Sequence, residues 1–303
     1  MQKKLIGYNK PLYILPFDHR NTFTKALFGN IEIANLTADQ IRVIQNAKQL
    51  VYEGFLYGTS LGIPKEYGAI LADEQFGDAI IRKAINSKVL TAVCTEKTGQ
   101  NEFDFEYGKD FPLHINKYNP DLVKVLIRYN PEGDPELNNR QKVNLKMLSD
   151  FCAENNYRFL FEMLIPPTAL QSGIDKEKYE TKLRPDLTVK AIAELQSFGI
   201  EVDIWKIEGM FAKSDYVNAV KQIRSGGRSG VGLIILGKAD NKDHVEHWLR
   251  TGADVDGVLG FAIGRTVFLD AVKSFHTGKV DREAAVKQIG TNYFNFYKIF
   301  TTK

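Results

Sequence analysis

Eight short apolar runs, separated by segments with helical spacing, constrain the fold of this chain more than any other feature. Each run is almost continuously hydrophobic, which is typical of parallel strands that are covered on both faces. The runs span residues 11–18, 68–74, 90–96, 122–129, 158–166, 202–209, 232–239 and 257–264. Eight alternations of strand and helix predict a (β/α)₈ TIM barrel, because right-handed crossovers keep consecutive strands parallel.

Helical segments are expected between these runs. Residues 137–155 follow the fourth run, and residues 187–198 follow the fifth, after the start signal Arg184-Pro185-Asp186. The long first connection holds a helix at about 41–57. Since no linker rich in Pro, Gly or Ser interrupts the pattern, residues 1–303 are expected to form a single domain, with barrel strands from about residue 11 to residue 264.

An open, doubly wound sheet is the alternative fold. Its dinucleotide-binding version places a glycine-rich loop after a strand and before a helix. The glycine-rich segment 225–232 instead precedes a strand, so we interpret it as a turn into the seventh strand.

Composition excludes several classes of function. The net charge of +3 comes from 40 basic and 37 acidic residues spread along the chain, so there is no basic block for nucleic acid. No leader pattern or run of membrane-spanning length is visible, which predicts a cytoplasmic protein.

The cysteines and histidines do not form a metal-binding pattern. Cys94 and Cys152 lack metal or disulfide spacing, and His244 and His247 are expected on a solvated helical face. No metal site is predicted.

Two lysines occupy the centres of apolar runs. Lys206 lies in the segment VDIWKIEG, and Lys124 lies in LVKVLIR. A buried lysine is rare unless it is paired, because an ammonium group is costly to remove from water. Burial and a second nearby ammonium both lower the pKa of a lysine, and the resulting free amine can form an imine with a carbonyl. The pair therefore predicts Schiff-base chemistry.

Charged residues and glycines gather at the carboxyl ends of the predicted strands, which form the catalytic face of this fold. For Lys124, Lys206 and Glu162, apolar neighbours on both sides indicate that the pleat points them into the barrel. Other charged residues at strand ends can equally well be exposed to solvent without a role in the site. They are Glu74, Lys97, Glu208 and Lys238.

The succession of these strand ends resembles a known family. The matching segments are 15–20 (LPFDHR), 73–77 (DEQFG), 96–99 (EKTG), 123–126 (VKVL), Glu162, 205–208 (WKIE) and 264–266 (GRT). Together they are similar to the class I aldolases of the family that contains tagatose-1,6-bisphosphate aldolase. The fuller phrases 129–134 (YNPEGD), 205–209 (WKIEG) and 260–266 (GFAIGRT) are closer to the 5-dehydro-2-deoxyphosphogluconate aldolase domain of myo-inositol catabolism.

The resemblance implies roles for individual residues. Lys206 is the Schiff-base lysine, Glu162 the proton shuttle and Lys124 the second active-site lysine, with Asp18 as an alternate base or hydroxyl anchor. A carboxylate that is partly desolvated, so that its pKa rises, suits the shuttle. His19 stands where the tagatose-type enzymes usually have Gln.

The resemblance also implies a phosphate grip, formed by Arg265 and the backbone amides of Gly264 and Gly237, which agrees with the phosphate site expected after strands seven and eight. Lys238 belongs to the same seventh-strand turn, and Glu96 lies at the third strand end. A substrate carboxylate needs a cation. The candidates for it are Arg20, Arg128 and Arg184.

The implied reaction is metal-free and needs no cofactor. It cleaves 5-dehydro-2-deoxygluconate 6-phosphate to dihydroxyacetone phosphate and malonate semialdehyde. Tagatose-1,6-bisphosphate or a related sugar phosphate is the alternative substrate. A non-catalytic barrel that binds a sugar phosphate and partners a kinase is a third hypothesis, although such a protein would not need both Lys206 and Glu162. The sequence is compatible with a homo-oligomer and does not fix the oligomeric state.

Overall fold

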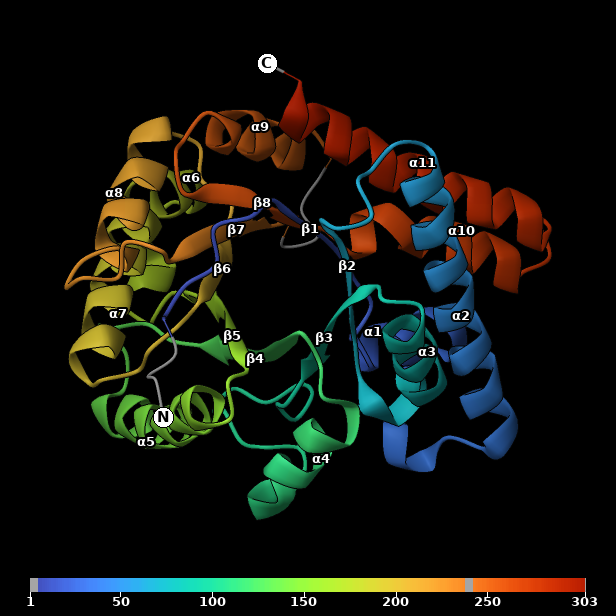
Figure 1. The fold of residues 1–303 in the computed structure, drawn as a ribbon, viewed down its shortest axis with the longest axis horizontal. Helices are drawn as coiled ribbons and strands as arrows, with labels where there is room; N and C mark the ends of the chain where they lie inside the picture. The colour runs from blue at the N-terminus through green and yellow to red at the C-terminus, as the bar shows by residue number, and fades with distance from the viewer. Residues whose placement is uncertain (1–4, 238–241, 303) are drawn as a thin grey trace.

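The computed structural model describes residues 5–237 and 242–302, and shows eight parallel strands closed into a barrel in chain order (Figure 1). The TIM-barrel prediction is confirmed. The open-sheet alternative is wrong, because β1 pairs with β8 as well as with β2. The strands are β1 Leu12–Pro16, β2 Gly68–Ala72, β3 Leu90–Cys94, β4 Leu122–Arg128, β5 Arg158–Leu164, β6 Ile204–Glu208, β7 Gly232–Leu236 and β8 Val258–Ala262.

Helices surround the strands on the outside of the ring (Figure 1). They are α1 Asn21–Phe28, α2 Ala38–Ser60, α3 Glu74–Asn86, α4 Phe111–Tyr118, α5 Pro135–Glu154, α6 Lys176–Lys178, α7 Arg184–Ser197, α8 Lys213–Ile223, α9 Lys242–Ala253, α10 Arg265–His276 and α11 Arg282–Thr301. Short 3₁₀ turns are η1 Ile33–Asn35, η2 Gly108–Asp110 and η3 Gln171–Gly173, and a π-helical turn is η4 Tyr179–Leu183. The expected helices at 41–57, 137–155 and 187–198 correspond to α2, α5 and α7. None of the helices in the described ranges is long and apolar enough to cross a membrane.

Side-chain caps fix where several helices begin. Thr37 and Gln40 form a reciprocal capping box at the start of α2. Asp73 caps α3, and Asp134 caps α5 directly before a proline. These polar residues end each preceding loop, so the carboxyl end of β2 passes into α3 with only Asp73 between them.

The apolar runs overestimate the strand ends by up to three residues. The first run was predicted to end at Asp18, whereas β1 ends at Pro16. Phe17 remains fully buried although it lies outside the strand. Hydrophobicity reports burial rather than strand geometry, so it continues into the loops at the carboxyl ends of the strands.

The interior of the barrel is layered. Apolar side chains fill its lower part, and they include Leu12, Ile14, Leu71, Leu122, Leu160, Ile204 and Ile234. Side chains alternate along a strand, so the next inward positions after Leu122, Leu160 and Ile204 are those two residues further on. They belong to Lys124, Glu162 and Lys206. The barrel interior therefore has a polar layer, nearer the carboxyl ends of the strands, directly above the apolar layer.

Candidate active site

A cavity of about 350 Å³ opens at the carboxyl ends of the strands. Ten of the residues proposed from the sequence line it: Asp18, Arg20, Glu96, Lys124, Arg128, Glu162, Lys206, Gly237, Gly264 and Arg265. Lys238 lies outside the described residues. The barrel thus brings residues from seven strand ends to one place.

Glu162 joins the two lysines of the cavity. Its Oε2 atom lies 2.8 Å from Nζ of Lys206 and 3.1 Å from Nζ of Lys124. Glu162 is paired in register with Lys206 across β5 and β6. All three side chains are less than 10% exposed. A carboxylate can therefore exchange a proton with either amine without a change in the sheet.

Lys124 is surrounded by three carboxylates. Its Nζ atom donates to Glu96 at 2.5 Å and to Asp18 at 2.8 Å, and Glu162 completes the group. Burial alone would lower the pKa of Lys124, but the three negative charges outweigh it and hold the pKa well above its ordinary value. The expected depression of this pKa is wrong for Lys124, because the sequence did not reveal the carboxylates that face it.

The carboxylates differ in the direction of their pKa shifts. Burial would raise the pKa of Glu162, yet Lys206 and Lys124 lower it below the ordinary value. The predicted rise is therefore wrong, since two adjacent ammonium groups outweigh desolvation. Asp18 likewise has a lowered pKa, through Lys124, against the effect of burial. Burial raises the pKa of Glu96 despite its bond to Lys124.

His19 lies beside this group at the carboxyl end of β1. Burial lowers its pKa to about 4, and the positive charge of Arg265 acts in the same direction, while Asp18 opposes them. The Nδ1 atom is 3.7 Å from a carboxylate oxygen of Asp18. His19 is therefore uncharged at neutral pH.

Arg265 begins α10 directly after the turn that follows β8. It lines the barrel cavity and also a second cavity of about 790 Å³ between α1, α10 and α11. Gly264 precedes it, and a Cβ atom there would lie 2.4 Å from the carbonyl oxygen of Pro16. Close packing against the end of β1 thus requires a glycine at this position, independently of any ligand.

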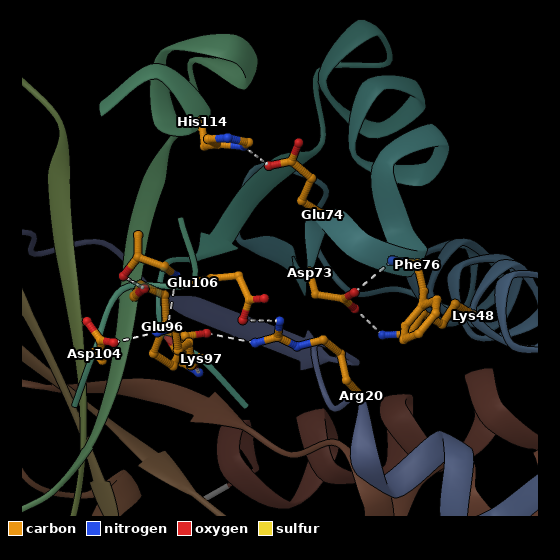
Figure 2. A network of polar contacts seen from close by, with 12 residues as sticks. Arg20, Lys48, Asp73, Glu74, Phe76, Glu96, Lys97, Asp104, Glu106 and His114 are labelled. Atoms are coloured by element: carbon orange, nitrogen blue, oxygen red, sulfur yellow. Dashed lines mark hydrogen bonds and ion pairs between the residues drawn. The ribbon is translucent and has the colours of Figure 1, made fainter. Parts of the chain in front are cut away.

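The three arginines proposed for a substrate carboxylate have different surroundings. Arg20 donates to Glu106 at 2.6 Å and to the carbonyl of Glu96 at 2.7 Å, as Figure 2 shows. Arg128 donates to the carbonyl of Gln100 at 2.7 Å. Arg184 is fully buried and is not among the residues that line the cavity; it pairs with the carboxylate of its neighbour Glu180.

The sequence interpretation missed a buried ion pair beside the site. Lys48 of α2 is fully buried and pairs with Asp73, at the end of β2 (Figure 2). Ile44 and Val51 lie on the same helix face and are also fully buried. A lysine within an apolar stripe of helical spacing is the sequence signal for this buried cation.

One group of potential metal ligands occurs within the described ranges. Asp18, Cys94 and Glu96 are close enough together to share an ion. Lys124 already donates hydrogen bonds to both carboxylates. The ammonium group stands where a cation would bind, so this donor set fits a lysine better than a metal.

A family model matches residues 6–303, and its description reads "Uncharacterized protein conserved in bacteria (DUF2090)". The chain belongs to the DUF2090 family.

Tagatose 1,6-diphosphate aldolases are similar in sequence to this DUF2090 protein. Aldolase 1 of Streptococcus mutans is 24% identical over 215 residues, which is 68% of this chain and 60% of that enzyme. Aldolase 2 of Enterococcus faecalis is 25% identical over 148 residues, 46% of this chain and 43% of that enzyme. The chain thus spans at most about 60% of the length of these relatives.

Solved structures share the fold of this DUF2090 protein. An archaeal fructose 1,6-bisphosphate aldolase has a TM-score of 0.56 at 14% identity, covering 96% of this chain and 93% of its own. A fructose-bisphosphate aldolase from Slackia heliotrinireducens has a TM-score of 0.55 at 14% identity, with coverages of 93% and 86%. At this identity the likeness concerns the barrel alone.

Proposed function

We propose that this protein is an aldolase that cleaves a ketose phosphate through an imine at Lys206. The observation that carries the proposal is the single carboxylate oxygen of Glu162, which lies within reach of both buried lysines inside the cavity. The similarity to tagatose 1,6-diphosphate aldolases supports the same reaction class.

Imine formation is the first step. Lys206 must give up a proton before its amine can attack the substrate ketone, and Glu162, 2.8 Å away, is the acceptor in reach. The lowered pKa of Glu162 keeps it ionised beside the charged Lys206, and the transfer itself removes one of the two charges that lower this pKa. Glu162 returns this proton to the hydroxyl group of the carbinolamine, which leaves as water, so that a protonated imine and an ionised Glu162 remain. Lys124 remains charged and offsets the negative charge of its three carboxylate neighbours.

Carbon–carbon cleavage is the second step. A carboxylate, Glu162 or Asp18, takes the proton from the hydroxyl group on the departing carbon. That carbon leaves as an aldehyde, and the bonding electrons move into the protonated imine to form an enamine. The protonated carboxylate then returns its proton to the enamine carbon, and water hydrolyses the imine to free the ketone and Lys206.

In this proposal the phosphate group of the substrate binds at the end of the eighth strand. Arg265 and the turn at Gly264 lie on the cavity wall at the start of α10, where a helix amino terminus favours an anion. This location leaves the reacting carbons of the sugar to face Lys206 and Glu162.

Two substrates are proposed. The resemblance to the inositol-catabolism aldolases favours 5-dehydro-2-deoxygluconate 6-phosphate, with dihydroxyacetone phosphate and malonate semialdehyde as products. The relatives found by sequence comparison favour tagatose-1,6-bisphosphate. Parallel cleavage assays with both sugars would rank them by kcat/KM.

The test of the imine is borohydride reduction in the presence of dihydroxyacetone phosphate. Mass spectrometry should locate the reduced adduct on Lys206, and Lys206→Ala should abolish both adduct and cleavage while the circular dichroism spectrum is unchanged. An adduct on Lys124 would reverse the roles of the two lysines. No adduct and no cleavage in the parent would favour the non-catalytic, kinase-partnered barrel instead.

A further inference from the structure

Lys48 is buried and charged, yet the proposed reaction does not use it. It lies on α2, outside the barrel, and has no exposed surface. Its Nζ atom donates to the carbonyl oxygen of Phe17 at 2.6 Å and pairs with the carboxylate of Asp73. The ammonium group also lies 4.9 Å from the centre of the Phe23 ring. One side chain thus connects α2 with the ends of β1 and β2.

Asp73 is held from both sides. One carboxylate oxygen accepts from Lys48, and the other accepts from the backbone N–H of Phe76 at 2.8 Å, where it caps α3 (Figure 2). The ion pair is therefore anchored to the start of a helix. Lys48 in turn has a fixed position from which to hold Phe17.

The carbonyl of Phe17 belongs to the peptide group that leads into Asp18. Because a peptide group is planar, holding its oxygen also sets the direction of the Asp18 backbone. The β1 strand ends at Pro16, and its last hydrogen bond to β2, from the Phe17 N–H to the carbonyl of Leu71 at 2.8 Å, comes before the peptide group that leads into Asp18. At the other end of this short segment, Arg20 is bound to Glu96 and Glu106. Two buried cations thus hold the segment 17–20.

We propose that Lys48, together with Asp73, is a positioning residue that holds Asp18 against Lys124 in the active site. Asp18 accepts from Lys124 at 2.8 Å, so a shift of its backbone would remove one of the three carboxylates around that lysine. The catalytic consequence rests on the proposed aldolase function, whereas the effect on the segment does not.

A double substitution, Lys48→Met with Asp73→Asn, tests this role. Asparagine keeps an oxygen for the Phe76 N–H, and no buried charge is left without its partner. The matched control is Arg228→Met with Glu201→Gln, which removes a cation–carboxylate pair that lies before β6 and β7, at the amino-terminal end of the barrel. We expect kcat to fall by about 10-fold or more in the test variant, with KM changed less than about twofold, and no change in the control.

A double-mutant cycle separates positioning from general destabilisation. If Lys48 acts through Asp18, then in an Asp18→Asn background the same double substitution should lower kcat by less than about twofold. Losses that multiply in the combined variant would overturn the proposal.

Hydrogen exchange gives a readout that does not depend on catalysis. Peptides that contain residues 17–20 should exchange about 10-fold faster in the test variant and at the parent rate in the control. Unchanged exchange would overturn the proposal, even if the parent formed no imine and the aldolase function failed. Should the double variant not fold, Lys48→Gln with Asp73→Asn, which leaves no buried charge and shortens the side chain that reaches Phe17, is subjected to the same cycle and exchange measurements.

Discussion

Glu162 and Lys206 are register partners on the neighbouring strands β5 and β6, and their side chains meet at 2.8 Å inside the barrel. The hydrogen-bond ladder of the sheet, rather than a loop, sets the position of the carboxylate relative to the amine. Sites built on strands hold their geometry better than sites on loops. This placement suits a residue that must move a proton to and from the reacting carbons.

Substituting Glu162→Gln tests the proton transfer. The amide preserves shape and hydrogen bonding but cannot accept a proton, so cleavage should slow by about 10² to 10⁴. Imine formation should also be slower, but the borohydride adduct should still accumulate, because water can take the proton from Lys206 during the longer trapping reaction. Stopped-flow cleavage assays and mass spectrometry of the adduct measure the two steps separately. Asp18→Asn is the comparison, and if Glu162→Gln were fully active, the proton transfer would be reassigned to Asp18.

Removing the second lysine should destabilise the protein in a pH-dependent way. Lys124→Met leaves Asp18, Glu96 and Glu162 without a shared cation, and an unpaired buried charge costs about 3 kcal/mol or more. The lowered pKa values of Asp18 and Glu162 mean that their contribution is present above the ordinary values of 3.8 and 4.5, and disappears as the pH falls through the lowered ones. The stability gap between parent and variant should therefore be larger at pH 7 than at pH 3.

Urea unfolding at the two pH values measures that gap. Lys190→Met, which removes an exposed pair with Glu132, serves as the control and should change stability little at either pH. A gap for Lys124→Met that is equal at pH 3 and pH 7 would contradict the assigned directions of the carboxylate pKa shifts.

Apolar patterning predicted all eight strands because burial on both faces leaves an uninterrupted hydrophobic run. It also predicted that Lys124, Glu162 and Lys206 point inward, because side chains alternate along a strand and apolar residues flank each of the three on both sides. These features depend on local order in the chain. The ends of the strands were less accurate, because Phe17 is as buried as the strand it follows.

The directions of the pKa shifts could not be predicted from the same pattern. The pKa of Lys124 depends on Asp18 and Glu96, which come from two other strand ends, 106 and 28 residues away in sequence. The partners of Arg20 are equally remote. Which charges face one another is a property of barrel closure and loop path, and the residue spacing along one strand does not contain it.

Arg265→Ala tests the phosphate grip. Charge-assisted hydrogen bonds contribute about 1.5 to 3 kcal/mol, so the affinity for dihydroxyacetone phosphate should fall by about one to two orders of magnitude. Isothermal titration with an unreactive Lys206→Ala background isolates binding from imine formation. Arg128→Ala is the control, since Arg128 lies on the β4 side of the cavity and should leave this affinity unchanged. Normal binding of dihydroxyacetone phosphate by Arg265→Ala would mean that the phosphate does not bind at the eighth strand.

Arg20 was one of the three candidates for binding a substrate carboxylate, and its contacts suggest a second role that can be tested against the first. If its main role is to anchor the β3–α4 connection through Glu106, then Arg20→Met and Glu106→Gln should increase hydrogen exchange in the same segment, 96–106. If Arg20 instead binds substrate, only Arg20→Met should raise KM for a carboxylate-bearing sugar. Comparing KM for substrates with and without a carboxylate distinguishes the two roles.

His19→Gln should change how stability depends on pH. The pKa of His19 is about 4 in the folded protein and 6.5 ordinarily, so between these values the unfolded chain binds a proton that the folded protein does not. His19 therefore lowers stability as the pH falls from 6.5 towards 4, and has no such effect above 6.5. Glutamine does not titrate, so the variant should lose less stability than the parent between pH 7 and pH 5 in urea unfolding. Equal losses would mean that the folded and unfolded states protonate His19 alike, and nuclear magnetic resonance titration of the ring would then give a pKa near 6.5.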